Sequence, residues 1–116
     1  MLACGGVGAN GVRILAPATV DLMRENQLDP TRLDYFHARF PHFRGYGYGL
    51  GVRTLIDKTV GSVCNLGEFG WGGAAGATVI ADADSGISMF YAHHMLNPQE
   101  AYYQPLIRDT MYKCFK

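Results

Sequence analysis

The sequence has no excess of charge of either sign and no long apolar run. Its 10 lysines and arginines balance 10 aspartates and glutamates, and no cluster of basic residues occurs. Because proteins that bind the phosphates of nucleic acids carry such clusters, we expect no nucleic-acid partner. No uninterrupted apolar stretch reaches the length of a membrane span, so we expect no membrane segment.

Cysteine is scarce and follows no motif. Cys4, Cys64 and Cys114 are odd in number and form no Cys-x-x-Cys pair, which argues against a disulfide framework and a redox site. Residues 1–6 have neither the charged nor the apolar region of a secretory signal. The sequence leaves the location of the protein open, and both absences favour the cytoplasm.

The four histidines do not form a metal-binding pattern. His93 and His94 are adjacent on an expected strand, so their side chains point to opposite faces and cannot share one ion. His37 and His42 lie in an irregular region without a cysteine or carboxylate at ligand spacing. We expect no metal and no other cofactor.

The composition is that of a globular protein. Hydrophobic residues make up 48% of the 116 residues and charged residues 17%, which is enough apolar material for one domain over residues 1–116. A net charge of zero combined with many aromatic residues also favours self-association.

A run of small residues over 69–77, interrupted by Trp71, is the most distinctive feature of the chain. Glycine has no Cβ, so a ligand or another chain can approach the backbone closely there. A β-bulge or a tight bend without chemistry is the alternative. Glu68 precedes the run and is either a solvated loop residue or a general base.

The N-terminal part, residues 1–44, is expected to be loop with one short helix. Pro17 suits the first turn of that helix, and Ala18–Glu25 continues it. Residues 26–44 are interpreted as a long loop with a helical turn at 30–36.

Residues 45–95 are expected to form antiparallel strands. Bulky residues alternate with glycine from Tyr46, which predicts a strand that continues to Asp57. Two further strands are expected at 75–82 and 87–95, joined by a turn in which Asp82 and Asp84 are turn formers. The fold class is therefore α+β, with an antiparallel sheet of three main strands.

A C-terminal helix over 97–115 is expected to cover one face of this sheet. Asn97 is the expected cap, Pro98 the first helical residue, and Glu100 completes a capping box. Pro105 should kink or restart the helix. The expected inward face consists of apolar residues at helical spacing: Tyr103, Ile107, Met111 and Cys114 or Phe115.

Three segments together resemble the C-terminal part of the β-lactamase-related serine hydrolases: class C β-lactamases, DD-peptidases and family VIII esterases. Arg13–Met23 resembles the beginning of a family helix, Gly45–Gly51 a glycine-rich family strand, and Gly67–Gly76 the third family motif with Trp-Gly-Gly. The resemblance implies part of a β-lactamase/transpeptidase-like fold and hydrolysis of an ester or amide through an acyl-serine intermediate.

The nucleophile and the base of that family are absent from this sequence. The three serines, Ser62, Ser85 and Ser88, are followed three residues later by Asn65, Ser88 and Tyr91, so no Ser-x-x-Lys motif occurs. No tyrosine has asparagine two positions later, so the Tyr-x-Asn motif is missing too. The chain resembles the C-terminal third of a hydrolase and is expected to be inactive alone.

The resemblance assigns roles to four residues. Ala74 would donate its backbone N–H to the oxyanion hole, and Trp71, Gly72 and Gly73 would contact the substrate. Trp71 replaces a cation of the motif, so neutral esters are favoured over substrates with a carboxylate. The substrate of the complete protein would be a small ester or amide. The alternative is a non-catalytic binding or self-associating module, in which an exposed strand edge pairs with another copy.

Overall fold

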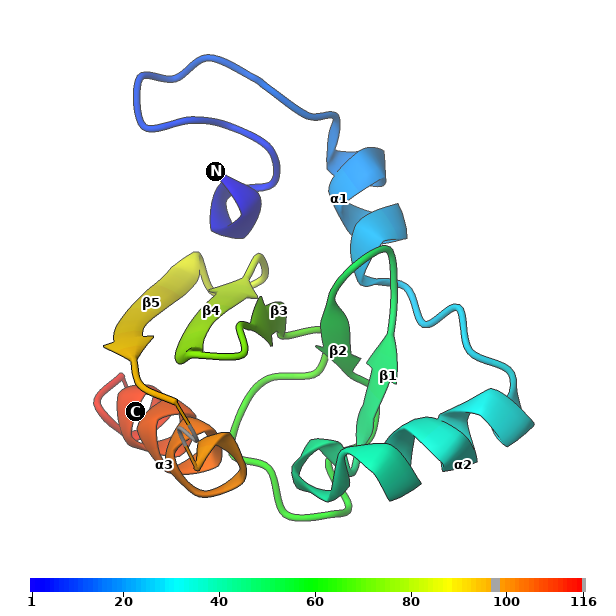
Figure 1. Cartoon of the computed structure of the whole chain (residues 1–116). Coiled ribbons are helices and arrows are strands. Elements are labelled where there is room, and N and C mark those ends of the chain that lie inside the picture. Colours follow the sequence, from blue (N-terminus) through cyan, green and yellow to red (C-terminus); the bar gives the residue numbers. More distant parts are fainter. Residues whose placement is uncertain (97–98, 116) are drawn as a thin grey trace.

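Consecutive strands of the chain lie side by side in one five-stranded antiparallel sheet, with α-helices around it (Figure 1). This computed structural model describes residues 1–96 and 99–115. Two 3-10 turns, η1 and η2, accompany three α-helices and five strands: η1 Leu2–Cys4, α1 Pro17–Arg24, α2 Pro30–Arg39, η2 Pro41–Phe43, β1 Tyr46–Tyr48, β2 Arg53–Leu55, β3 Phe69–Gly72, β4 Gly76–Asp82, β5 Ile87–His94 and α3 Glu100–Lys113.

The α+β class is confirmed, but the expected count of three strands is wrong. The expected strand over 46–57 is a hairpin, in which β1 and β2 pair Tyr48 with Arg53. The chain reverses over 49–52, where Gly51 has a φ of 79°, a left-handed conformation that favours glycine. Strand β3 was not expected at all, and it lies within the small-residue run. Alternation of bulky residues with glycine cannot distinguish one long strand from two short ones joined by a glycine turn.

Residues 26–44 are helical rather than mainly loop. Asp29 caps α2, since its side chain accepts a hydrogen bond from the Arg32 N–H at 2.9 Å. Pro30 occupies the first helical turn, where its missing N–H costs nothing, so it starts the helix instead of breaking it. Phe36 of α2 packs into a core with Phe43 and neighbouring aromatic rings.

The C-terminal helix is present, and α3 continues through Pro105, so of the two outcomes expected there, a kink or a restart, the restart does not occur. Gln99 is its N-cap; the expected cap Asn97 and the expected first residue Pro98 lie outside the described residues. Among the described residues, no helix has both the length and the apolar character of a membrane span.

The inward face of α3 differs from the expected apolar face. Gln104, Arg108 and Tyr112 are buried, whereas Tyr103 is 41% exposed and Phe115 is 67% exposed. The buried residues of α3 have specific partners: the Tyr112 hydroxyl donates to Asp82 of β4. Arg108 lies 5.0 Å from the centre of the Tyr46 ring.

A buried ion pair lies at the centre of the sheet. Arg53 of β2 donates to both carboxylate oxygens of Glu68, at 2.9 and 3.1 Å, and the Tyr46 hydroxyl donates to the same carboxylate at 2.9 Å. Glu68 is completely buried, so the expectation that it is a solvated loop residue is wrong. Its contacts with Arg53 and Tyr46 also argue against a general base with a free carboxylate.

Asp82 joins the helix to the sheet. It accepts hydrogen bonds from the backbone N–H groups of Asp84 and Ser85, which confirms its role in the turn. It also accepts hydrogen bonds at 2.8 Å from the Tyr112 hydroxyl of α3 and from the Asn65 side chain. Burial opposes the charged form of Asp82, but these donors outweigh it and hold the pKa of the carboxyl below its ordinary value of 3.8.

Removing one partner of the buried ion pair should be severely destabilising. We expect Glu68→Gln to lower the free energy of unfolding by about 3–5 kcal/mol, because Arg53 would keep a buried charge without a counterion. Urea unfolding followed by circular dichroism measures this. The matched control is Arg32→Gln, which breaks the exposed Arg32–Asp29 pair and should cost less than about 1 kcal/mol. Equal losses in the two variants would contradict this role for the pair.

The Asp82 contacts predict a defined loss of stability in acid. Because the folded pKa is lower than the unfolded one, the carboxylate stabilises the fold above its unfolded pKa, and this contribution disappears as the pH falls through the folded pKa. Between neutral pH and about pH 3, Asp82→Asn should therefore lose less unfolding free energy than the natural chain. Asp34→Asn, at an exposed position of α2, should behave like the natural chain. Parallel losses in all three proteins would argue against the prediction.

Candidate functional site

The four residues that the sequence assigned to a site lie at the end of β3 and in the turn that follows. Trp71 and Gly72 are the last residues of β3, and Gly73 and Ala74 lead toward β4. Trp71 pairs with Val79 and Gly72 with Thr78 across the β3–β4 ladder. The segment is therefore continuous with the centre of the sheet, which holds its backbone in place.

One edge of β3 is open beside these residues. β2 pairs with Phe69 and Gly70 only, so it covers the first half of β3. The Gly73 N–H donates to the Ala77 carbonyl at 2.8 Å, toward β4. Since backbone groups alternate in direction along an antiparallel strand, the N–H and C=O of Gly72 point to the opposite side, past the end of β2. An extended ligand could pair with this edge.

The Ala74 N–H is a donor without an acceptor among the described residues. The Gly76 N–H donates to the Gly73 carbonyl at 2.8 Å, so residues 73–76 form a tight turn with Ala74 as its second residue. Ala74 is exposed in this turn. Its N–H is thus available to an external acceptor and is held on a fixed backbone, as an oxyanion donor must be.

The surroundings of the three glycines at 70, 72 and 73 differ in how much room they leave for a side chain. A Cβ at Gly70 would lie 2.0 Å from the Val79 carbonyl oxygen, so the backbone of β4 requires glycine there. A Cβ at Gly72 would lie 2.7 Å from the Gln104 amide nitrogen. A Cβ at Gly73 would meet nothing within 4 Å. The surrounding described residues therefore do not require glycine at 73.

Aromatic side chains that the sequence analysis did not assign to the site surround Trp71. Its ring meets Tyr48 and Phe40 nearly edge-to-face, with centroids 5.1 and 6.0 Å apart, and lies 5.7 Å from Phe43. Such contacts fix the orientation of the indole. The spacing of Phe36, Phe40 and Phe43 in the sequence was the available signal, but the loop interpretation of residues 26–44 concealed it.

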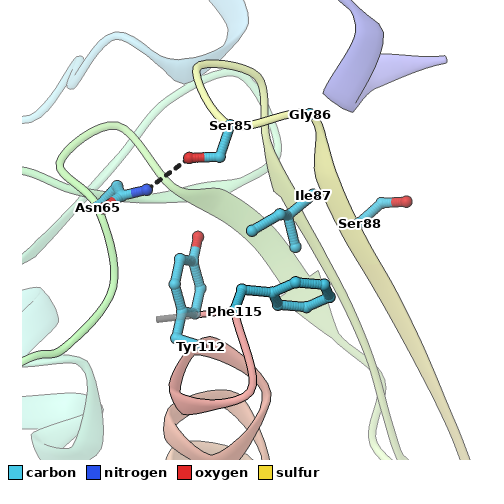
Figure 2. Close-up of a pocket in the computed structure, with 7 residues that line it drawn as sticks. All are labelled: Asn65, Ser85, Gly86, Ile87, Ser88, Tyr112 and Phe115. Atoms are coloured by element: carbon cyan, nitrogen blue, oxygen red, sulfur yellow. Dashed lines mark hydrogen bonds between the residues drawn. The ribbon is translucent and has the colours of Figure 1, made fainter.

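Ser85 and Ser88, two of the three serines, lie together in one pocket. The pocket has a volume of about 720 Å³ and lies between the β4–β5 turn and the end of α3 (Figure 2), and it is lined by Asn65, Ser85, Gly86, Ile87, Ser88, Tyr112 and Phe115. Ser85 accepts a hydrogen bond from the Asn65 amide at 2.7 Å, and the described residues that line the pocket include no histidine or lysine. These residues therefore offer no base that would activate a serine there.

The four histidines have different surroundings, and one of them lies near the candidate site. His94 pairs with Gly76 across the β4–β5 ladder, two residues from Ala74. His37 Nε2 is 2.7 Å from the Tyr46 carbonyl oxygen, and burial lowers the pKa of His42, whose ring packs at a tilt against Phe43. Burial alternates along β5, with His93 half-buried and His94 exposed. No group of three or more potential metal ligands occurs within residues 1–96 and 99–115.

Comparison with known sequences finds longer proteins that match this chain over a short stretch of their length. No family model matches the chain. Two relatives from Mycobacterium tuberculosis strains, uncharacterized protein MT1414 and protein Rv1367c, are each 30% identical to it over 86 residues. This alignment covers 71% of the chain and 21% of each relative, so the chain spans about a fifth of their length.

Comparison with solved structures identifies the fold. The chain superimposes on EstCE1, a hydrolase with promiscuous acyltransferase activity, with a TM-score of 0.71 and 27% identity, over 96% of the chain and 26% of EstCE1. Simvastatin synthase (LovD) from Aspergillus terreus gives a TM-score of 0.68 at 19% identity, over 90% of the chain and 30% of the enzyme. The chain is therefore related in fold to the β-lactamase-like hydrolases, and corresponds to about a quarter of such a structure.

Two alanine substitutions should separate the structural glycine from the one that the fold does not require. We expect Gly70→Ala to lower the free energy of unfolding by about 2 kcal/mol or more, because β4 must move away. Gly73→Ala should leave it unchanged or raise it by up to about 1 kcal/mol, since alanine restricts the unfolded chain. Chemical denaturation of both variants tests this, and a comparable loss for Gly73→Ala would show that the fold does require glycine at 73.

Proposed function

We propose that this chain supplies one wall of the acyl-transfer site of a larger β-lactamase-like serine hydrolase. The observation that carries the proposal is the free Ala74 N–H, held on a tight turn at the open edge of β3. The fold relationship to EstCE1 supports it, because that protein is a hydrolase with acyltransferase activity.

In the proposed reaction, a serine from outside this chain attacks the carbonyl carbon of an ester or amide. Negative charge develops on the carbonyl oxygen, and the Ala74 N–H donates a hydrogen bond to it. A base that also lies outside this chain takes the serine proton and passes it to the alcohol or amine, which leaves as its bond to the carbonyl carbon breaks. Water then hydrolyses the acyl-serine to the free acid and serine. The serine's own backbone N–H would be the second donor, and losing one donor of such a pair costs about 10²–10³ in rate.

Trp71 supports an uncharged substrate. An indole at this position offers an apolar surface where a lysine would offer a positive charge. A substrate carboxylate would find no cation at Trp71, whereas the acyl group of a neutral ester would contact its ring. Neutral esters are therefore the proposed substrate class, ahead of β-lactams and other carboxylate-bearing amides.

A non-catalytic, self-associating module is the second candidate. The sheet order places β5 at an edge, and Phe90 on that strand is 72% exposed. An open edge with an apolar side chain can pair with another copy of the chain. This candidate predicts a defined oligomer without any catalytic role for Ala74.

A chimeric enzyme tests the first candidate. The stretch of EstCE1 that this chain matches is replaced by the chain, and hydrolysis of p-nitrophenyl butyrate is measured. We expect turnover by the chimera and none by the chain alone. Ala74→Pro should then lower kcat about 100-fold or more, because it removes the N–H at a turn position that accepts proline. Ala74→Ser keeps the N–H and should retain activity.

Two outcomes would contradict the proposal. Equal activity in the Ala74→Pro and Ala74→Ser chimeras would exclude an oxyanion role for this backbone N–H. A folded chimera without turnover, together with a defined oligomer of the isolated chain in sedimentation velocity, would favour the self-associating module.

A further inference from the structure

An apolar groove runs from α2 to the indole of Trp71. It has a volume of about 360 Å³, within the usual range for small-molecule sites. Helix α2 contributes two aromatic side chains and its C-cap residue a third, and the segment before the helix, β1 and β3 supply the remaining apolar wall: Leu28, Tyr35, Phe36, Phe40, Tyr48 and Trp71.

The charged residues of the groove do not make it a site for ions. Arg32 is paired with Asp29 at 3.0 Å, and the Arg39 guanidinium lies over the Phe40 ring at 5.5 Å. The Arg32 charge is thus neutralised by Asp29, and the Arg39 charge is in contact with a ring that itself lines the groove. What the groove offers to a ligand is apolar surface.

The shape of the groove does not depend on the ligand. Asn26 connects the two sides, because its Oδ1 accepts hydrogen bonds from the Leu28 and Tyr48 N–H groups at 3.2 and 3.1 Å. The Gln27 N–H donates to the Tyr48 carbonyl at 2.9 Å. On the opposite wall, the edge-to-face contacts of Trp71 with Tyr48 and Phe40 hold the indole in place. A preformed site avoids the cost of ordering its side chains on binding.

The groove ends at Trp71, close along the chain to the candidate oxyanion donor. Trp71 lines the groove and precedes Ala74 by three residues, so their Cα atoms are at most about 10 Å apart along an extended chain. A ligand whose carbonyl oxygen accepts from the Ala74 N–H can thus extend an unbranched chain past Trp71 toward α2.

We propose that this groove binds the aliphatic acyl chain of a medium-chain ester, with the ester carbonyl directed to Ala74. This inference rests on the proposed acyl-transfer function for the orientation of the ligand, but the binding itself needs no catalysis. It narrows the substrate from neutral esters in general to those with an unbranched acyl chain.

The single tryptophan of the chain allows a direct test, because fluorescence excited at the long-wavelength edge, where tyrosine does not absorb, reports on Trp71 alone. The complete 116-residue chain is titrated with hexanamide and octanamide, uncharged acyl compounds without a scissile ester. We expect a saturable change in emission, and about tenfold tighter binding of octanamide, since two more methylenes are buried.

Two exposed tyrosines provide matched variants. Tyr35, 74% exposed, lines the groove, whereas Tyr102, 64% exposed, lies on α3 and does not line it. Tyr35→Ala should weaken octanamide binding about fivefold or more, and Tyr102→Ala should leave it unchanged. Because both side chains are exposed, neither substitution creates a cavity in the core, and circular dichroism of each variant verifies folding.

Three results would overturn the inference: no saturable change up to the solubility limit, affinities that do not depend on chain length, or equal weakening by both tyrosine variants. A change of Trp71 emission on dilution of the protein alone would identify a second copy as the occupant of the groove instead. Saturable, chain-length-dependent binding combined with an inactive chimera would leave the groove assignment intact and reject the acyl-transfer function.

Discussion

The buried pair of Arg53 and Glu68 is the interaction on which the sheet depends. Arg53 pairs with Tyr48 on one side and with Gly70 on the other, so its backbone joins β1 to β3. Its side chain ends on the Glu68 carboxylate and passes the Tyr46 ring at 4.6 Å. Two buried charges are tolerated only when they are paired and hydrogen-bonded, and this requirement fixes the position of Glu68 directly before β3. The candidate site begins three residues later.

The second constraint is the attachment of α3 to the sheet by polar contacts. Tyr112 donates to Asp82 at the end of β4, and Arg108 lies over the Tyr46 ring. Gln104 lies against Gly72, so the same helix face extends from the β4–β5 turn to the candidate site. The helix in turn leaves apolar side chains on its outer surface, including Tyr102 and Leu106. Directed contacts thus add to the apolar cluster that Tyr112 and Met111 of α3 share with Phe36, Phe43 and Tyr46.

These constraints give the end of β3 its particular chemistry. The strand is fixed at Phe69 and Gly70 by neighbours on both sides, and from Trp71 on it has a neighbour on one side only. Backbone donors are therefore both rigid and accessible, a combination that electrostatic catalysis requires. The aromatic groove next to Trp71 adds apolar surface to the same place, so recognition of an acyl chain and polarisation of its carbonyl can occur on adjacent elements.

The sequence by itself determined the elements whose signals are local. Pro17 at a first helical turn and the turn formers around Asp82 correctly predicted α1 and the β4–β5 turn, and the strand expected at 87–95 is present as β5. The small-residue run also located the candidate site, through residues that resemble a family motif. These features depend on the conformational preferences of neighbouring residues, which a sequence displays directly.

Tertiary structure alone decided the rest. Glutamate is a residue type that usually lies at the surface. Only the approach of Arg53 from another strand makes the burial of Glu68 possible. The buried face of α3 is polar because Asp82 and Tyr46 lie opposite, which no periodicity of apolar residues can indicate. Likewise, Gly70 is required by the Val79 backbone, and the groove exists because α2 packs beside Trp71. Each of these features depends on contacts between segments that are distant in the sequence. Packing and charge compensation in the folded chain decide which of those segments meet.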